Sequence, residues 1–393
     1  MEEKRPTIKL KRGRESSLTR RHPWIFSGAV KETTGNMMDG AMVDIFSHRG
    51  EYLGMGHYQA GASIAVRMLS FVPLEEDILW REKILKAWEY RKRIGISDNP
   101  DTNVFRLIFS EGDGLSGLIA DYYDGVVVLQ AHSMGMYLSR HAIAYSIHEV
   151  LGSRLRAVFD KSRETLHGKA GSIENGFIWG SAEDSKIIVE NGNRFKINWV
   201  TGQKTGFFID QRENRKLVGS YSAGKRVLNT FCYTGGFSVY AGRNGAREVH
   251  SVDSSKSAMA IAEENMQING ISNYGLFTED VFNFLQTCGE YEMIILDPPA
   301  FAKKLHARHQ AVIGYKRLNA AAIKKISPGG ILFTFSCSQV VDKRLFQDTV
   351  IAAAIEAGRN IRIMHWLSQP MDHPVDIFHP EGEYLKGLAV YVE

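Results

Sequence analysis

Cysteine is scarce in this 393-residue sequence: it occurs only at Cys232, Cys288 and Cys337, and no two cysteines form a CxxC pair. This argues against a disulfide framework and against a zinc site built from cysteines, and the scattered histidines lead us to expect no metal. No apolar run approaches the ~20 residues that a helix needs to cross a bilayer, and the amino terminus shows no signal peptide. We therefore expect a cytoplasmic protein with no membrane contact.

The sequence also lacks the G-x-G-x-x-G and Walker motifs of phosphate-binding loops, yet it has a glycine turn between a strand and a helix. Residues 227–231 have the apolar pattern of a strand, Tyr233-Thr234-Gly235-Gly236 is a tight turn, and residues 237–243 begin a helix. Glycine has no Cβ, so the backbone of such a turn can approach a ligand closely. Because no pyrophosphate motif is present, an adenosyl ligand without phosphates fits best, and S-adenosylmethionine is the common one.

The strand after the glycine turn, residues 248–252, ends in a carboxylate, Asp253. A carboxylate about twenty residues beyond such a turn is expected to accept hydrogen bonds from ribose hydroxyls. These patterns predict a nucleoside site formed by Asn229, Phe231, Tyr233, Thr234, Gly235, Gly236, Asp253 and Ser254.

Two later apolar runs also end in polar groups. One is followed by Asp297-Pro298-Pro299 and Phe301, and the other by Ser336-Cys337-Ser338. Since the carboxyl ends of parallel strands share one edge of a sheet, we expect an α/β fold in which all these groups converge. The rigid prolines, the carboxylate and the aromatic ring suit a flat base, and Cys337 is the candidate nucleophile.

Positive charge is concentrated locally, although the net charge of the chain is only +4. Residues 1–21 hold eight basic and three acidic side chains, and residues 303–317 hold five basic side chains and no acidic one. Such surpluses suit phosphates, so we expect RNA contacts. The candidates are Lys11, Arg12, Arg14, Arg20, Arg21 and Lys303, together with Pro298 and Phe301 at the base site.

The pattern of strands and turns divides the chain into three predicted domains. Residues 1–72 are rich in short strands, expected at 41–46, 52–58 and 63–69, which suits a small β-barrel. Residues 73–190 combine a helix, expected between Glu75 and Arg93, with a hairpin around Asp124-Gly125. Residues 191–393 contain the predicted cofactor domain.

Along nearly its whole length the sequence resembles the bacterial 23S rRNA 5-methylcytosine methyltransferases of the ribosomal large subunit methyltransferase I family. The motifs that carry the resemblance occur in order and are Lys11-Arg12-Gly13-Arg14-Glu15, Arg20-Arg21-His22-Pro23-Trp24-Ile25-Phe26-Ser27-Gly28, Phe105-Arg106-Leu107-Ile108, Glu111-Gly112-Asp113-Gly114-Leu115, Lys204-Thr205-Gly206-Phe207-Phe208-Ile209-Asp210-Gln211-Arg212, Tyr233-Thr234-Gly235-Gly236-Phe237, Asp297-Pro298-Pro299 and Phe335-Ser336-Cys337-Ser338.

The resemblance implies an N-terminal PUA domain, a central α+β domain and a Rossmann-like class I methyltransferase domain that uses S-adenosylmethionine. It also implies 23S ribosomal RNA as the substrate. It places the family's nucleophilic cysteine on Cys337 and its motif IV carboxylate on Asp297, and it adds Gln211, Asp280 and Asp297 to the predicted cofactor contacts.

Two alternatives stay open at this stage. The Asp297-Pro298-Pro299 sequence also occurs in enzymes that methylate amino groups, so a base nitrogen is a second possible target, with Cys337 structural. A non-catalytic RNA-binding protein of ribosome assembly is the other alternative. The sequence leaves a homodimer open, and it does not identify the positive field that would ionise Cys337, whose thiol would otherwise be mostly protonated.

Overall fold

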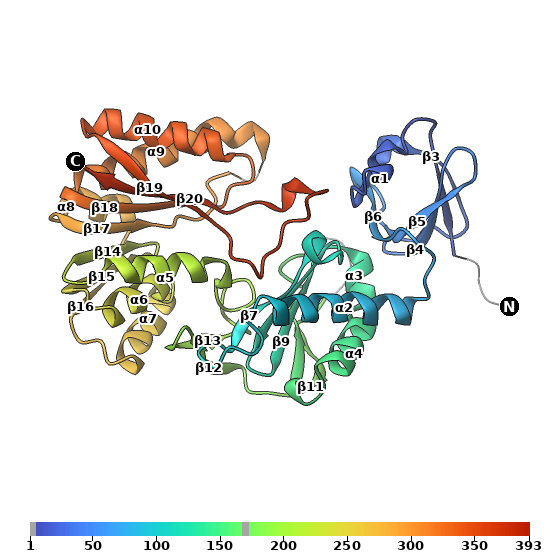
Figure 1. The fold of residues 1–393 in the computed structure, drawn as a ribbon, viewed down its shortest axis with the longest axis horizontal. Helices are drawn as coiled ribbons and strands as arrows, with labels where there is room; N and C mark the ends of the chain where they lie inside the picture. Colours follow the sequence, from blue (N-terminus) through green and yellow to red (C-terminus); the bar gives the residue numbers. More distant parts are fainter. Residues whose placement is uncertain (1–4, 167–172, 303) are drawn as a thin grey trace. The chain divides into compact units, whose positions relative to one another are not determined.

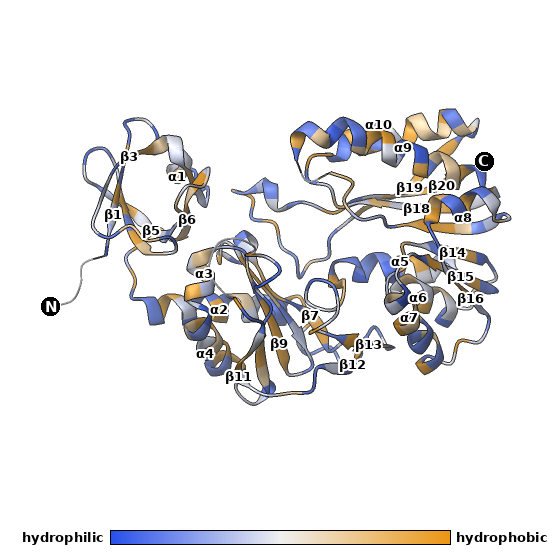
Figure 2. Cartoon of the chain, turned by 180° about the vertical axis from the view of Figure 1, so that it is seen from behind, coloured by the Kyte–Doolittle hydropathy of each residue, from blue (hydrophilic) through white to orange (hydrophobic). Residues whose placement is uncertain are grey.

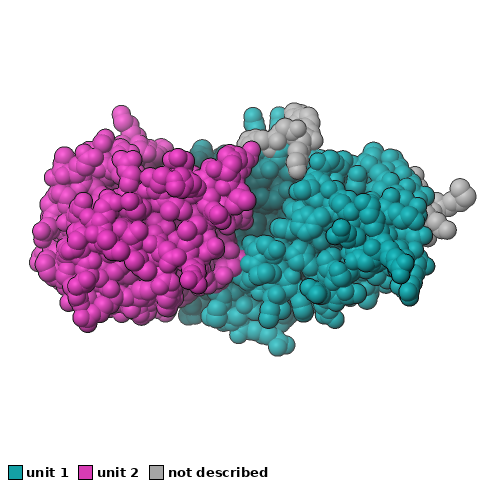
Figure 3. Space-filling view, turned by 90° about the horizontal axis from the view of Figure 1, so that it is seen from above, with its two compact units in different colours: residues 1–188, 198–209, 371–382 teal, residues 189–197, 210–370, 383–393 magenta. Residues whose placement is uncertain are grey.

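The structure, a computed structural model, describes residues 5–166, 173–302 and 304–393 (Figure 1). The chain forms two compact units (Figure 3): unit 1 is Met1–Ile188, Asn198–Ile209 and Met371–Gly382, and unit 2 is Val189–Ile197, Asp210–Pro370 and Glu383–Glu393. Over the described residues, no helix combines the length and apolar character needed to cross a membrane.

Unit 1 begins with a six-stranded sheet in the order β2-β6-β5-β4-β1-β3. The short helix α1 (Ser16–Thr19) lies between β1 and β2 in the sequence. The strands are β1 (Thr7–Leu10), β2 (Trp24–Phe26), β3 (Val30–Thr34), β4 (Met42–Phe46), β5 (Tyr52–Tyr58) and β6 (Ile64–Ser70). Alternating residues of β1 and β4, such as Ile8, Val43 and Ile45, are fully buried in its core. The three strands that the sequence predicted here are β4, β5 and β6.

The second sheet of unit 1 has five strands in the order β11-β10-β9-β8-β7 and packs against α2 (Glu76–Arg93) and α4 (Arg140–Leu151). The remaining elements are β7 (Val104–Phe109), β8 (Leu118–Tyr123), β9 (Val126–Ala131), α3 (Met134–Leu138), β10 (Ala157–Asp160) and β11 (Gly176–Gly180). Asp124 and Gly125 both have positive φ, as the predicted two-residue hairpin requires. Strands β12 (Ser185–Glu190) and β13 (Asn193–Asn198) pair only with each other among the described residues.

Unit 2 contains a seven-stranded sheet in the order β16-β15-β14-β17-β18-β20-β19. Its strands are β14 (Arg226–Thr230), β15 (Glu248–Asp253), β16 (Tyr274–Thr278), β17 (Tyr291–Leu296), β18 (Ile326–Ser336), β19 (Ile361–Ser368) and β20 (Lys386–Val392). Strands β14 to β18 are parallel to one another, and β20 is antiparallel to both β18 and β19. The strand order reverses between β14 and β17, where open α/β sheets bind their ligands.

Helices cover both faces of this sheet (Figure 1). On one face, α8 (Val281–Thr287), α9 (Arg308–Lys324) and α10 (Lys343–Ala357) bury apolar side chains against β14, β17, β18 and β20. On the other face lie α5 (Arg212–Tyr221), α6 (Gly236–Arg243) and α7 (Lys256–Ile268). Helix α10 carries both hydrophilic and hydrophobic residues (Figure 2), and its buried residues, Phe346, Thr349, Val350, Ala353 and Ala354, have the spacing of one helix face. The predicted α/β class is confirmed.

Candidate active site

Four parallel strands bring their carboxyl ends to one edge of the sheet in unit 2. In the register of the sheet, Thr230 lies opposite both Val252 and Leu296, and Leu296 lies opposite Thr334. Asp253 is the last residue of β15, and the glycine turn, Asp297 and Cys337 directly follow β14, β17 and β18. The strand register therefore confirms that these segments leave the sheet at one edge, as the sequence predicted.

The glycine turn has a backbone that ordinary side chains rarely adopt. Phe231, Tyr233 and Gly235 have φ values of 54°, 48° and 79°. A Cβ on Gly235 would lie 3.2 Å from the Cβ of Ala262 on α7, so a side chain there would be crowded as well as strained. The turn thereby leads directly into α6, and the backbone N–H groups of the turn lie close to the strand ends.

Asp253 ties this turn to the neighbouring strand. Its Oδ2 accepts a hydrogen bond from the Tyr233 N–H and its Oδ1 accepts one from the Ser255 N–H, both at 2.9 Å. A carboxylate offers about four acceptor positions, so further positions remain on the two oxygens for ribose hydroxyls. Because Asp253 is half-buried and Ser254 beside it is exposed, the carboxylate can meet a ligand from solvent. These residues fit an adenosyl group.

Other predicted cofactor residues have structural partners. Asn229 is fully buried, and its Nδ2 donates to Ser238 Oγ at 2.8 Å. Gln211, 3% exposed, accepts a hydrogen bond from Asn214 Nδ2 at the start of α5. Asp280 caps α8 by accepting the Asn283 N–H at 3.1 Å. Thr234 is buried and its carbonyl accepts from the Asn265 amide, which braces the turn. Cofactor contacts by these four side chains stay predictions.

Asp297 is the first residue of the part of the candidate site that is expected to bind the base. It follows β17 directly and is half-buried, whereas Pro298 is buried and Pro299 is exposed. The ring of Phe301 packs on Tyr315 of α9, with 4.5 Å between ring centroids. Tyr315 therefore already occupies one of the positions at which an aromatic ring could pack on Phe301. Lys303, predicted to contact RNA, lies outside the described residues.

Cys337 follows β18 and is half-buried, between the buried Ser336 and Ser338. Two side chains that the sequence did not reveal hold the segment around it. The hydroxyl groups of Tyr315 and Ser338 are hydrogen-bonded at 3.0 Å. The Nζ atom of Lys386, on β20, donates to the carbonyls of Ser338 and Val341, both at 2.7 Å. No local sequence signal distinguishes Lys386 from an ordinary lysine at a strand start.

The other two cysteines are in settings that disfavour a thiolate. Burial raises the pKa of Cys232 well above its ordinary value, and the charge of Asp253 adds to the effect. The sulfur of Cys232 packs against that of Met259 at 3.4 Å, as a small core residue would. Burial also raises the pKa of Cys288. The expectation that neither acts as the nucleophile agrees with these surroundings.

The predicted RNA contacts near the amino terminus are all exposed: Lys11, Arg12, Arg14, Arg20 and Arg21. Arg20 lines a pocket of about 390 Å³ together with Ser17, His22, Phe26, Ile377 and Phe378, all within unit 1. Phe26 and Phe378 are 51% and 45% exposed. Cations beside accessible aromatic rings are the chemistry that binds unpaired nucleotides.

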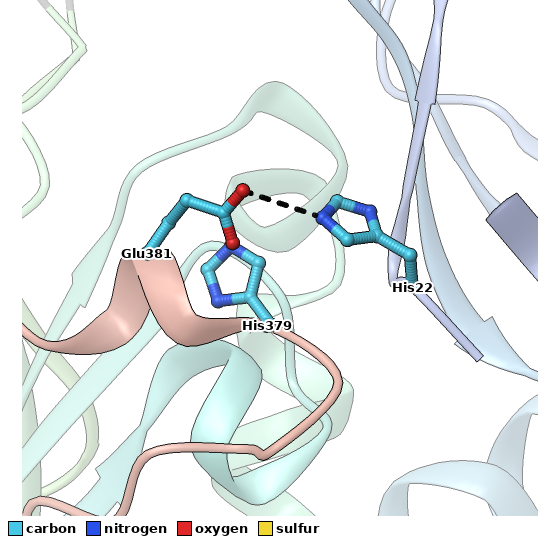
Figure 4. A group of neighbouring side chains, drawn as sticks. All are labelled: His22, His379 and Glu381. Carbon is cyan, nitrogen blue, oxygen red and sulfur yellow. Dashed lines mark ion pairs between the residues drawn. The ribbon is translucent and has the colours of Figure 1, made fainter. Parts of the chain in front are cut away.

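A cluster of His22, His379 and Glu381, also in unit 1, has the composition of a metal site (Figure 4). Its Nε2 to carboxylate distances are 3.7 Å from His22 and 3.8 Å from His379. However, the backbone N–H of Trp24 donates a hydrogen bond to His22 Nδ1 at 3.2 Å. When His22 is neutral, its ring proton is therefore on Nε2, the atom that faces Glu381. That arrangement does not suit ligation of a cation by His22.

Comparisons with known proteins agree with this geometry. A family model of S-adenosylmethionine-dependent methyltransferases matches residues 114–380, and a PUA-like domain model matches residues 8–71. A methyltransferase from Streptococcus mutans has the same fold, with a TM-score of 0.83 at 22% identity, covering 98% of this chain and 99% of that one. A methyltransferase solved with S-adenosylhomocysteine aligns with a TM-score of 0.84 at 21% identity, covering 98% and 99%.

The sheet order, the glycine turn and these matches define the chain as an S-adenosylmethionine-dependent methyltransferase with a PUA-like N-terminal domain. Ribosomal RNA large subunit methyltransferase I of Aeromonas hydrophila is 38% identical over 395 residues, and that of Tolumonas auensis is 37% identical over 394 residues. Each alignment covers 98% of both chains. The chain belongs to the ribosomal RNA large subunit methyltransferase I family.

Proposed function

We propose that this chain transfers a methyl group from S-adenosylmethionine to carbon 5 of a cytosine in 23S ribosomal RNA. The observation that carries the proposal is the position of Cys337, a half-buried thiol directly after β18, whose neighbour β17 is directly followed by Asp297. The names of the full-length relatives support ribosomal RNA as the substrate. Such a substrate places the protein in the cytoplasm.

A thiolate is needed because carbon 5 of cytosine is a weak nucleophile. In the proposed reaction Cys337 Sγ bonds to carbon 6, the ring takes up a proton at N3, and the electron pair of the former 5,6 double bond becomes available at carbon 5. S-adenosylmethionine, when bound, would supply an electrophilic methyl carbon: carbon 5 would bond to it as the bond from methyl to sulfur breaks, which would leave S-adenosylhomocysteine. Carbon 5 then loses its proton, the Sγ to carbon 6 bond breaks, the double bond returns, and N3 releases its proton.

Asp297 and the glycine turn have separate tasks in this proposal. Asp297 accepts a hydrogen bond at the amino and N3 edge of the base, and the rigid Pro298 keeps that carboxylate at the strand end. Asp253 holds the ribose of the cofactor. Since a stacked and paired base cannot reach Cys337, the substrate is an unpaired or flipped cytosine, at a cost of roughly a few kcal/mol.

The N-terminal domain supplies the RNA contacts in this proposal. The exposed cations Lys11, Arg12, Arg14, Arg20 and Arg21 meet phosphates. An unpaired base stacks in the pocket against Phe26 and Phe378, with Arg20 at its rim. Both contacts are independent of the cofactor site, so they set where on the RNA the protein binds rather than which atom it methylates.

The test combines nucleoside analysis with covalent trapping. Mass spectrometry of ribosomal RNA should show one 5-methylcytidine fewer in a strain without the protein than in its parent. RNA with 5-fluorocytidine at the target should become bonded to the parent enzyme and to Cys288→Ala, because fluorine blocks the final loss from carbon 5, but not to Cys337→Ala.

The results also separate the alternatives. A missing nitrogen-methylated base, with full activity in Cys337→Ala and no adduct in the parent, would establish methylation of a base nitrogen. Unchanged modification of ribosomal RNA, together with a defect in subunit assembly, would make the chain a non-catalytic assembly protein.

A further inference from the structure

Lys386 holds a buried ammonium group against the segment that carries Cys337. In the antiparallel pairing of β18 with β20, Lys386 lies opposite Ser336, the residue before the cysteine. The lysine is only 6% exposed. Its Nζ donates to the Ser338 and Val341 carbonyls, which are just beyond Cys337 in the chain. The lysine therefore meets this segment on both sides of the thiol.

Among the described residues, the ammonium group of Lys386 has no carboxylate at ion-pair distance. Within the described part of the chain, no aspartate or glutamate forms an ion pair with Nζ; the nearby Glu383 is instead paired with Lys343, on α10. Two carbonyl dipoles accept two of the three N–H bonds of an ammonium group. Buried lysines are rare unless they are paired, because an unpaired buried charge is costly. A nearby anionic group is therefore expected to stabilise the charge on Lys386.

Cys337 is the ionisable group best placed to be that partner. Burial lowers the pKa of Lys386 to about 8, and the opposing effects come first from the charge of Cys337 and then from Asp342 and Glu383, while Lys343 adds to the lowering. With a pKa of about 8, the lysine is mainly protonated at neutral pH. A positive charge is thus present beside the thiol under the conditions in which the enzyme works.

We propose that Lys386 is the positioning residue that keeps Cys337 ionised, by supplying the positive charge beside its sulfur. The thiol proton passes to solvent, the electron pair stays on Sγ, and Lys386 keeps its own proton throughout. Nearby opposite charges favour the ionised form of a thiol. This inference rests on the proposed function only for its catalytic consequence, because the ionisation of Cys337 can be measured without any substrate.

The first measurement is the pH dependence of alkylation of Cys337 in the full-length protein, between about pH 6 and about pH 10, with the Cys337 peptide quantified by mass spectrometry. In the parent, the pKa obtained should lie below the value of ~8.5 for an ordinary thiol. The Cys232 and Cys288 peptides report, in the same samples, whether general exposure has changed. A parent pKa at or above ~8.5 overturns the proposal, whatever any variant does.

Variants then assign the effect to Lys386. Lys386→Met removes the charge and should raise the Cys337 pKa by about one unit or more, which is about tenfold less thiolate at neutral pH. Lys386→Arg keeps the charge and should restore most of the shift. Lys343→Met is the matched control, because this exposed lysine of the same unit already has Glu383 as its partner. If Lys386→Met does not fold, Lys386→Gln replaces it.

Methyl transfer gives a second readout. The activity of Lys386→Met should fall about tenfold at neutral pH and recover as the pH is raised, because hydroxide then ionises the thiol without help. A lysine with only a structural role would give a loss that does not depend on pH. An unshifted alkylation profile in Lys386→Met, with Cys337 still trapped on 5-fluorocytidine, overturns this inference and keeps the proposed function. A shifted alkylation profile without any trapped adduct supports this inference and overturns the proposed function.

Discussion

Replacement of Asp253 tests the cofactor site most directly. The carboxylate accepts the N–H groups of Tyr233 and Ser255, each at 2.9 Å, and has acceptor positions left for the ribose hydroxyls of S-adenosylmethionine. Asp253→Ala removes those positions and frees the turn at Tyr233. A hydrogen bond to a charged group contributes roughly 1.5 to 3 kcal/mol, so loss of one such bond should weaken cofactor binding by about tenfold to about a hundredfold.

Asp253→Asn is a second variant for the same measurement of cofactor affinity. An asparagine side chain has one acceptor oxygen and one donor nitrogen, so it can accept only one of the two backbone N–H groups and places a donor against the other. We therefore expect its affinity to be reduced as well, although the side chain has nearly the same volume. Glu248→Ala is the matched control, because Glu248 lies at the opposite end of β15, where it pairs with Arg226.

The assay is isothermal titration calorimetry of the full-length protein with S-adenosylmethionine, with thermal unfolding recorded to confirm that each variant is folded. Glu248→Ala should bind like the parent, whereas both Asp253 variants should bind more weakly. Parent-like affinity in a folded Asp253→Ala protein would refute the assignment of Asp253 to the ribose, and with it the assigned orientation of the cofactor along the strand ends.

Three other changes have defined outcomes. Glu190→Gln removes the carboxylate that accepts two hydrogen bonds at 2.8 Å from the buried Arg215 guanidinium, and it should lower the free energy of unfolding in urea by about 3 kcal/mol; a loss below about 1 kcal/mol would contradict this. Burial lowers the pKa of His57 from 6.5 to about 3, so the unfolded chain takes up a proton that the folded chain excludes between these values. Stability should therefore fall as the pH is lowered through that range, and His57→Gln should reduce the slope measured by unfolding at a series of pH values. Replacing the exposed N-terminal arginines with alanine should weaken RNA binding and flatten its dependence on salt without changing cofactor affinity, and an unchanged salt slope would show that they do not contact phosphate; the four are Arg12, Arg14, Arg20 and Arg21.

Much of the candidate site could be predicted from the sequence because its parts are local. An apolar run followed by a polar residue marks a buried strand and its end, and parallel strands place such ends at one edge of a sheet whatever the order of the strands. Asp253, Asp297 and Cys337 could therefore be found without a structure. The glycine turn could be found from Gly235 and Gly236, whereas the positive φ of Phe231 and Tyr233 has no signal in the sequence.

The roles of individual side chains within that site depended on tertiary structure. Asn229, whose cofactor contact stays a prediction, donates a hydrogen bond to the buried Ser238, and the strand pleat and the packing of α6 decide that contact. Glu190 accepts two hydrogen bonds from Arg215 across a separation of 25 residues, and neither residue shows that partner in its local pattern.

Lys386 shows most clearly what the sequence by itself left undecided. The sequence determined that Cys337 would lie at a strand end, among the polar groups of the candidate cofactor and base sites. Only the fold placed a lysine from 49 residues further along the chain beside it, because β20 inserts antiparallel between β18 and β19. Strand order in a sheet is set by packing of the whole domain, so the charge next to the candidate nucleophile is a property of the tertiary structure.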